Sequence, residues 1–313
     1  MKRFASFLRR NSFVLVLLLA FAATDLAVAK WDPLKSSLRF YKNDFTKTLY
    51  HHNWADAGPV FFGNSAVTGA YMEDKSKHPL VEMGLSYGSI NDLKGILQNK
   101  LYRVQGELVI GIDIHTMVDK MPTEPSTDST YPWLKKWYQP YLFAYRDYLK
   151  DSGEEALRSL YTGTVELDRS KLLAYTPRWI DKELYFGRKP DDFLKERWNF
   201  YNEKFGAMTM DDFRQNLDAL QYVMQYAARE QIPLRVVWMP YNKAYPEFAY
   251  MKPLKAEVNK LLEANRVPVF DAMGRYEPQY FHDLVHLNRE DGAPLFTKEV
   301  DEWLESLAKP SKS

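Results

Sequence analysis

Three side chains in this sequence could together carry out nucleophilic catalysis. Ser65 comes directly after Asn64 and the short apolar run 59–62, and Asp283 and His286 stand three residues apart far downstream. A serine hydroxyl is a weak nucleophile until a histidine accepts its proton, and that histidine needs a carboxylate to fix its tautomer. The residues therefore predict a catalytic triad in the order Ser65, Asp283, His286. There are ordinary alternatives. A serine at this position is also typical of a turn, and an Asp-x-x-His pattern also occurs by chance.

The triad needs a scaffold that brings both ends of the chain together. Short apolar runs typical of buried strands occur at 59–62, 81–85, 108–112, 234–239 and 267–270. A period of 3.6 residues predicts helices near 90–97, 211–230, 254–264 and 288–307. This alternation predicts a flavodoxin-like three-layer α/β/α fold with a central parallel sheet. Ser65 would then lie at the carboxyl edge of the sheet, where ligands bind in such folds.

The N-terminus resembles an export signal. Four cations precede an apolar run, Phe13–Ala23, which is interrupted by Asp25 and resumes before Lys30. The run suits a signal peptide, with Ala27–Ala29 as a cleavage site, and also an uncleaved membrane anchor. A buried N-terminal helix is the remaining alternative. Either form of the signal predicts that the rest of the chain works outside the cytoplasm.

Three further segments are predicted along the chain. Residues 31–57 form a stalk or first helix, and residues 58–308 form the α/β domain with an insertion at about 121–210. The insertion lacks the strand–helix alternation and is dense in Trp and Tyr between Tyr131 and Tyr148. It is predicted to be mainly helical. A helical subdomain with an aromatic core, a lid over an acceptor polymer and a docking surface for a membrane partner are the alternatives.

Composition excludes several functional classes. The absence of cysteine excludes disulfide scaffolds and cysteine-based nucleophiles or metal sites. The 42 Lys and Arg residues balance 41 Asp and Glu residues, so no basic field favours nucleic acid. Without H-x-x-x-H or H-E-x-x-H patterns, we predict no metal and no cofactor. His115, after the strand 108–112, is a candidate for the pocket together with Asp113, with a structural histidine as the alternative.

Three short blocks resemble the SGNH (GDSL-like) hydrolase superfamily. Phe62–Ser65 is similar to the first block, whose last residue is the nucleophile, and Met83–Ser89 is similar to the second, whose glycine amide lines the oxyanion hole. Asp283–Asn288 is similar to the last block, which supplies the acid and the base. The resemblance implies the SGNH hydrolase fold. The N-terminal signal and the D-x-x-H-L-N ending are most similar to the DltD-like branch, whose members work in the cell envelope beside membrane-bound O-acyltransferases.

One position departs from this resemblance. The third superfamily block carries an Asn that donates to the oxyanion, and Asp113 occupies the corresponding place. An ionised carboxylate cannot donate a hydrogen bond, so Asp113 is turned away, protonated or not the true counterpart. The oxyanion hole would then rest on the backbone amides of Ser65 and of Gly84 or Gly88, with the Asn64 side chain as a further candidate.

The expected function follows from the triad and the resemblance. It is acyl transfer of a D-alanyl or other O-acyl group through an acyl-Ser65 intermediate. The acceptor would be an envelope glycan or a teichoic-acid-like polymer, and the partner a membrane-bound O-acyltransferase. The alternatives are an esterase or deacetylase acting on an acylated glycan and a catalytically silent scaffold.

Overall fold

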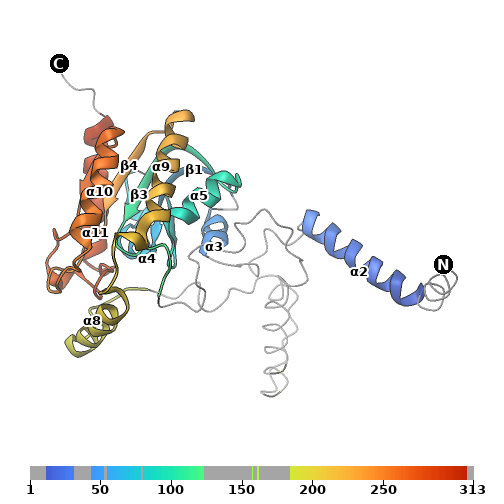
Figure 1. Ribbon diagram of the computed structural model, residues 1–313, viewed down its shortest axis with the longest axis horizontal. Coiled ribbons are helices and arrows are strands. Elements are labelled where there is room, and N and C mark those ends of the chain that lie inside the picture. Colours follow the sequence, from blue (N-terminus) through green and yellow to red (C-terminus); the bar gives the residue numbers. More distant parts are fainter. Residues whose placement is uncertain are drawn as a thin grey trace. The chain divides into compact units, whose positions relative to one another are not determined.

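A computed structural model of the protein describes residues 12–31, 44–52, 55–78, 80–122, 157, 161 and 184–308 (Figure 1). Residues 47–122 and 184–308 belong to one compact unit, which contains every residue of the predicted site, and the described residues up to 46 belong to another. The elements, in chain order, are α2 (Ser12–Trp31), α3 (Asp44–His51), β1 (Ala57–Asn64), α4 (Ser65–Ala70), η1 (Glu73–Lys75), β2 (Val81–Leu85), α5 (Ile90–Gln98), β3 (Arg103–Ile112), α8 (Asp191–Phe205), η3 (Met210–Phe213), α9 (Arg214–Arg229), β4 (Leu234–Trp238), α10 (Met251–Ala264), β5 (Val269–Asp271), η4 (Pro278–Tyr280) and α11 (Gly292–Ala308).

Five parallel strands form the central sheet, in the order β2-β1-β3-β4-β5. From β1 the chain adds β2 on one side of the sheet, and it then adds β3, β4 and β5 in turn on the other side. The strand order therefore reverses between β1 and β3. Ligands of open α/β sheets bind outside the carboxyl ends of the strands at such a switch point. The fold therefore predicts a ligand-binding site beside the residues that follow Asn64 and Ile112.

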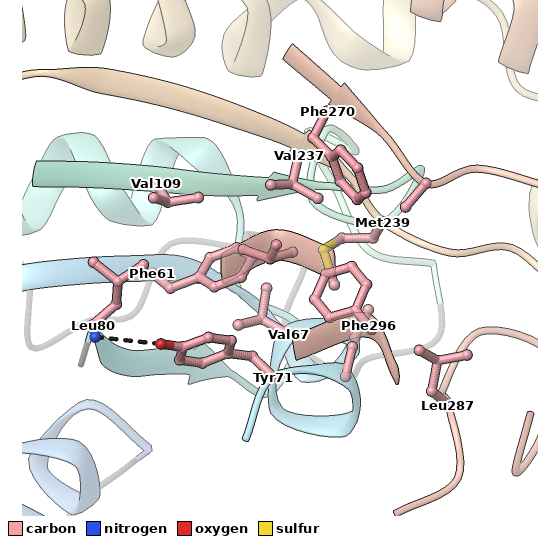
Figure 2. Close-up of a cluster of buried hydrophobic side chains, with 14 of the residues drawn as sticks. Phe61, Val67, Tyr71, Leu80, Val109, Val237, Met239, Phe270, Leu287 and Phe296 are labelled. Carbon is pink, nitrogen blue, oxygen red and sulfur yellow. Dashed lines mark hydrogen bonds between the residues drawn. The ribbon is translucent and has the colours of Figure 1, made fainter. Parts of the chain in front are cut away.

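Both faces of the sheet are buried. Phe61 of β1, Val109 of β3 and Val237 of β4 point into one apolar cluster with residues of α4 and α11 (Figure 2). Successive strand residues point to opposite faces, and the neighbouring Phe62 and Ile110 are also fully buried. Helices α5 and α9 pack side by side (Figure 1). The protein thus has the predicted α/β class, with a parallel sheet covered on both faces as in an α/β/α architecture.

Helices α4 and α11 come together because both cover the cluster around Phe61. The rings of Phe61 and Phe296 stack with centroids 6.4 Å apart, and Tyr71 meets Phe61 edge-on at 5.1 Å. Thr297 of α11 accepts a hydrogen bond from the Met72 amide at 2.9 Å, just after α4. The end of β1 and the start of α11 are therefore held in one packed unit.

Most predicted elements occur where the sequence places them, and β3 is the clearest difference. It begins at Arg103, five residues before the predicted run 108–112, because residues 103 and 104 pair with residues 57 and 58 of β1. This first part is largely exposed and polar, so apolar periodicity does not reveal it.

Helix α3 falls within the predicted stalk 31–57 and α8 within the predicted insertion 121–210. The aromatic-rich stretch 131–148 lies outside the described residues.

The predicted leader coincides in part with helix α2. In the described ranges of the chain, no helix combines the length and the apolar character needed to cross a membrane. Export of the protein remains a prediction from the sequence.

Gly63 allows the close approach of α4 to the end of β1. A β-carbon at this position would collide with the Val67 side chain and press against the Gly111 carbonyl. We expect Gly63→Ala to lower the free energy of unfolding by about 1–3 kcal/mol, as for other overpacked cores. In chemical denaturation, Val67→Ala should offset part of this loss, so that the double variant is more stable than the sum of the single effects predicts. Strictly additive effects would contradict this account.

Candidate active site

The structure brings the three predicted triad residues together. The Ser65 Oγ lies 2.9 Å from the His286 Nε2, and the His286 Nδ1 lies 2.9 Å from each carboxylate oxygen of Asp283. An ionised carboxylate can only accept hydrogen bonds, so Nδ1 carries a proton and Nε2 of the neutral imidazole accepts the Ser65 hydroxyl proton. This is the geometry in which a histidine can remove a proton from a serine nucleophile.

Asp283 is kept ionised by its surroundings. Its Oδ1 accepts hydrogen bonds from the backbone amides of Val285 at 3.1 Å and His286 at 2.9 Å. Burial alone would raise the pKa of this carboxyl, but electrostatic attraction to the His286 ring and the hydrogen bonds from His286 and Val285 outweigh burial and hold the pKa below its ordinary value. Asp283 therefore presents a negative charge to the imidazole, which stabilises an imidazolium formed during proton transfer.

The position of Ser65 follows from the junction of β1 and α4. Asn64 ends the strand in an extended conformation and caps the helix, because its Oδ1 accepts from the Ala66 amide at 2.8 Å. Ser65 is the first residue of the helix, and its hydroxyl is at the carboxyl edge of the sheet. The local sequence thus turns the chain sharply enough to expose the nucleophile.

Asp113 is ionised and its carboxylate is turned toward Asn64. Of the alternatives left open by the sequence, the structure therefore favours a carboxylate that is turned away from the pocket. Its Oδ1 accepts from the Asn64 Nδ2 at 2.8 Å, from the Thr116 amide at 2.7 Å and from the Thr116 hydroxyl at 2.6 Å. Its Oδ2 faces the His115 Nδ1 at 3.4 Å. Burial favours the neutral form, but the interactions with His115 and Thr116 lower the pKa of Asp113 to about 2. The carboxylate does not line the pocket and instead orients the Asn64 amide.

Gly84 and Gly88 do not supply the amides predicted for the oxyanion hole. The Gly84 amide donates to the Glu82 carboxylate at 2.8 Å, and the Gly88 amide donates to the Leu85 carbonyl at 2.8 Å. Neither glycine lines the pocket beside Ser65. Both are needed for packing instead, because a β-carbon would collide with α4 at Gly84 and with the turn after β2 at Gly88.

The pocket beside Ser65 combines the sheet edge with helix α8. The sheet edge and the loop of the histidine contribute Asn64, Ser65, His115, Val285 and His286. Helix α8 contributes Arg197, Tyr201 and Phe205, and two loops contribute Tyr87 and Met121. The sequence analysis missed the α8 residues because only Leu194 and Phe205 of this helix are buried, so it shows no apolar face.

The two other histidines near the site have different environments. His115 lines the pocket, one of the two alternatives left open by the sequence, and its ring packs edge-on against Phe205 at 4.9 Å and Tyr201 at 5.4 Å. His282 does not line the pocket, and its Nδ1 donates to the Gly187 carbonyl at 2.7 Å. No cluster of acidic and histidine side chains suited to a metal ion occurs in the described ranges.

Tyr185 is a residue at the site that the sequence did not reveal. Its ring stacks on the His286 imidazole, with centroids 4.1 Å apart and 16° between the planes. Its φ of 66° is a left-handed conformation that costs a bulky residue about 1–2 kcal/mol. The Tyr185 carbonyl accepts from the Arg289 amide at 3.1 Å, which fastens this segment to the loop of His286. Strained backbone of this kind is often retained where it serves a site.

Comparison with known proteins does not assign this chain to a group. No family model matches it, and no curated protein matches it significantly.

The stacking of Tyr185 predicts a selective effect on turnover. Tyr185→Leu should lower kcat about ten- to a hundredfold with little change in KM, because the imidazole loses its fixed orientation and Tyr185 does not line the pocket. Tyr185→Phe keeps the ring and should stay close to the wild-type kcat. Steady-state kinetics and the NMR signal of the His286 Nδ1 proton check this. A Leu variant with wild-type kcat and an unchanged proton signal would refute it.

The lowered pKa of Asp113 predicts a pH-dependent contribution to stability. Its folded pKa is about 2, against an ordinary value of 3.8, so the contribution is present above about pH 4 and is lost as the pH falls toward 2. Asp113→Asn should remove about 2 kcal/mol at pH 7 and flatten the loss of stability between pH 4 and 2. Denaturant titrations across this range measure both. A variant with the wild-type slope would show that Asp113 does not carry this dependence.

Proposed function

We propose that this protein is a serine-dependent enzyme that transfers an acyl group through an acyl-Ser65 intermediate. The observation that carries the proposal is the continuous hydrogen-bonded chain from the Ser65 hydroxyl through His286 to the ionised Asp283. The lowered pKa of Asp283 keeps its carboxylate ionised, which allows it to orient the imidazole.

The proposed reaction has two steps, acylation of Ser65 and transfer of the acyl group to the acceptor. The Ser65 Oγ attacks the carbonyl carbon of an ester while its proton moves to the His286 Nε2, and that proton then leaves with the departing alkoxide. A hydroxyl of the acceptor next gives its proton to the His286 Nε2 and attacks the acyl-Ser65 carbonyl. The new ester leaves, and the proton returns to the Ser65 Oγ. Water in place of the acceptor hydroxyl makes the same site an esterase.

The Asn64 side chain is our candidate for stabilising the oxyanion. One N–H of its Nδ2 donates to Asp113, while the second N–H has no acceptor among the described residues, and Asn64 lines the pocket beside Ser65. Asp113 cannot itself donate, but it fixes the amide that can. The second N–H of Asn64, together with the Ser65 amide, would serve the function that the Asn of the third superfamily block serves in SGNH hydrolases.

The biological setting is proposed from the sequence together with the fold. The motif residues at the ends of β1 and before α11, and the strand order 2-1-3-4-5, agree with an SGNH hydrolase-like domain. The cationic and apolar N-terminus favours export. We therefore propose that the acceptor is a hydroxyl on an envelope glycan or teichoic-acid-like polymer and that a membrane-bound O-acyltransferase supplies the acyl group.

A serine-directed probe tests the catalytic assignment. A fluorophosphonate should label the full-length protein at Ser65, with no label in Ser65→Ala and at least about a thousandfold slower labelling in His286→Ala. Ser306→Ala is the matched control, because Ser306 is exposed on α11 and its hydroxyl donates to the Trp303 carbonyl. Mass spectrometry locates the adduct. Labelling that persists in Ser65→Ala would reject Ser65 as the nucleophile, and no labelling of the wild type would favour a binding scaffold.

Acyl transfer and hydrolysis are then separated by the acceptor. With an activated acyl ester, a transferase should form more acylated product as a polyhydroxylated glycan is added, at the expense of free acid. An esterase would release the same amount of free acid at every glycan concentration.

A further inference from the structure

The positive and negative charges near the pocket differ in whether a ligand can reach them. Among the lining side chains in the described part of the chain, Arg197 alone is permanently charged. The carboxylates of Asp113 and Asp283 do not line the pocket, and their oxygens face the donors of Asn64, Thr116 and the two neighbouring histidines. Among the described lining residues, a substrate in the pocket therefore meets a guanidinium and no carboxylate.

Arg197 interacts with the Tyr201 hydroxyl, but its charge has no carboxylate partner among the described residues. Within the described residues it forms no ion pair, whereas Arg188, Arg214 and Arg229 each have a carboxylate partner. Its guanidinium lies over the rings of Tyr201 at 5.0 Å and Phe200 at 5.3 Å. An arginine stacked on aromatic rings still presents the N–H groups at its edge, which match the oxygen atoms of a carboxylate or phosphate.

Tyr201 adds a neutral donor to the same wall. Burial raises the pKa of Tyr201 above its ordinary value, so its hydroxyl stays protonated at neutral pH. The α8 side of the pocket thus offers one cation and one hydroxyl. Among the described residues that line this wall, no side chain carries a negative charge that would attract an ammonium group.

We infer that the substrate carries an anionic group, a carboxylate or a phosphate, that contacts Arg197 while its ester lies at Ser65. This inference rests on the proposed function and narrows it. Of the two kinds of acyl group expected above, an uncharged or anionic acyl group fits the pocket, and an α-aminoacyl group such as D-alanyl does not.

Three activated esters with small acyl groups of different charge test this inference on the full-length protein. They are 4-nitrophenyl acetate, its carboxylate-bearing analogue mono-4-nitrophenyl succinate, and 4-nitrophenyl D-alaninate. We expect kcat/KM to rank succinate above acetate and acetate above alaninate. Raising the salt concentration toward about 1 M should compress these differences, because exposed charges are then screened. A phosphonate-bearing acyl ester, compared with the succinate, shows which anion the site prefers.

Variants of Arg197 assign the preference to this residue. Arg197→Gln should lower the succinate-to-acetate ratio of kcat/KM about threefold, and Arg197→Glu should lower it about tenfold and favour the alaninate. Arg229→Gln is the matched control, since Arg229 lies on α9, is paired with Glu230 and does not line the pocket. It should leave all three ratios unchanged.

The outcomes separate this inference from the proposed function. If the wild type turns over all three esters with equal kcat/KM, or if Arg197→Glu keeps the wild-type ranking, the charge selection is wrong while the triad stands. If no ester is turned over and the fluorophosphonate does not label Ser65, the proposed function itself fails.

Discussion

The hydrogen bond between Ser65 and His286 is the interaction on which the site depends, and it joins residues 221 positions apart. It forms because α4 and α11 share the apolar cluster around Phe61, which brings the end of β1 next to the loop that precedes α11. The Arg289 side chain strengthens this junction by donating to the Thr68 carbonyl of α4 at 3.2 Å. Loss of packing beneath the sheet edge would therefore separate Ser65 from His286 without changing either residue.

Two carboxylate–histidine pairs lie at this edge, and their surroundings give them different roles. Asp283 contacts the His286 imidazole at 2.9 Å through both oxygens, so the pair is suited to proton transfer with Ser65. Asp113 approaches His115 only at 3.4 Å and makes its shorter contacts to Asn64 and Thr116. In both cases hydrogen bonds overcome the cost of burial and keep the carboxylate charged. The second pair supports the geometry of the first through Asn64.

The elements with strong apolar periodicity could be predicted from the sequence, and those without it could not. The runs that became β1 and β4 are buried on both faces, so their continuous apolar composition indicates strands directly. The exposed first part of β3 and the mostly exposed helix α8 carry no such pattern. Helix α8 nevertheless forms one wall of the pocket, so its lining residues were the hardest to identify from the sequence.

The sequence by itself determined which chemistry was available: a serine at a strand end, an Asp-x-x-His near the C-terminus and alternating strands and helices. Only the tertiary structure decided which of these groups meet and what each one does. Asp113 became a support for Asn64, the amides of Gly84 and Gly88 were already bonded, and Tyr185 came to stack on His286. The physical reason is that a side chain's protonation, orientation and free hydrogen-bonding groups depend on neighbours distant in the chain, which strand order and helix packing select.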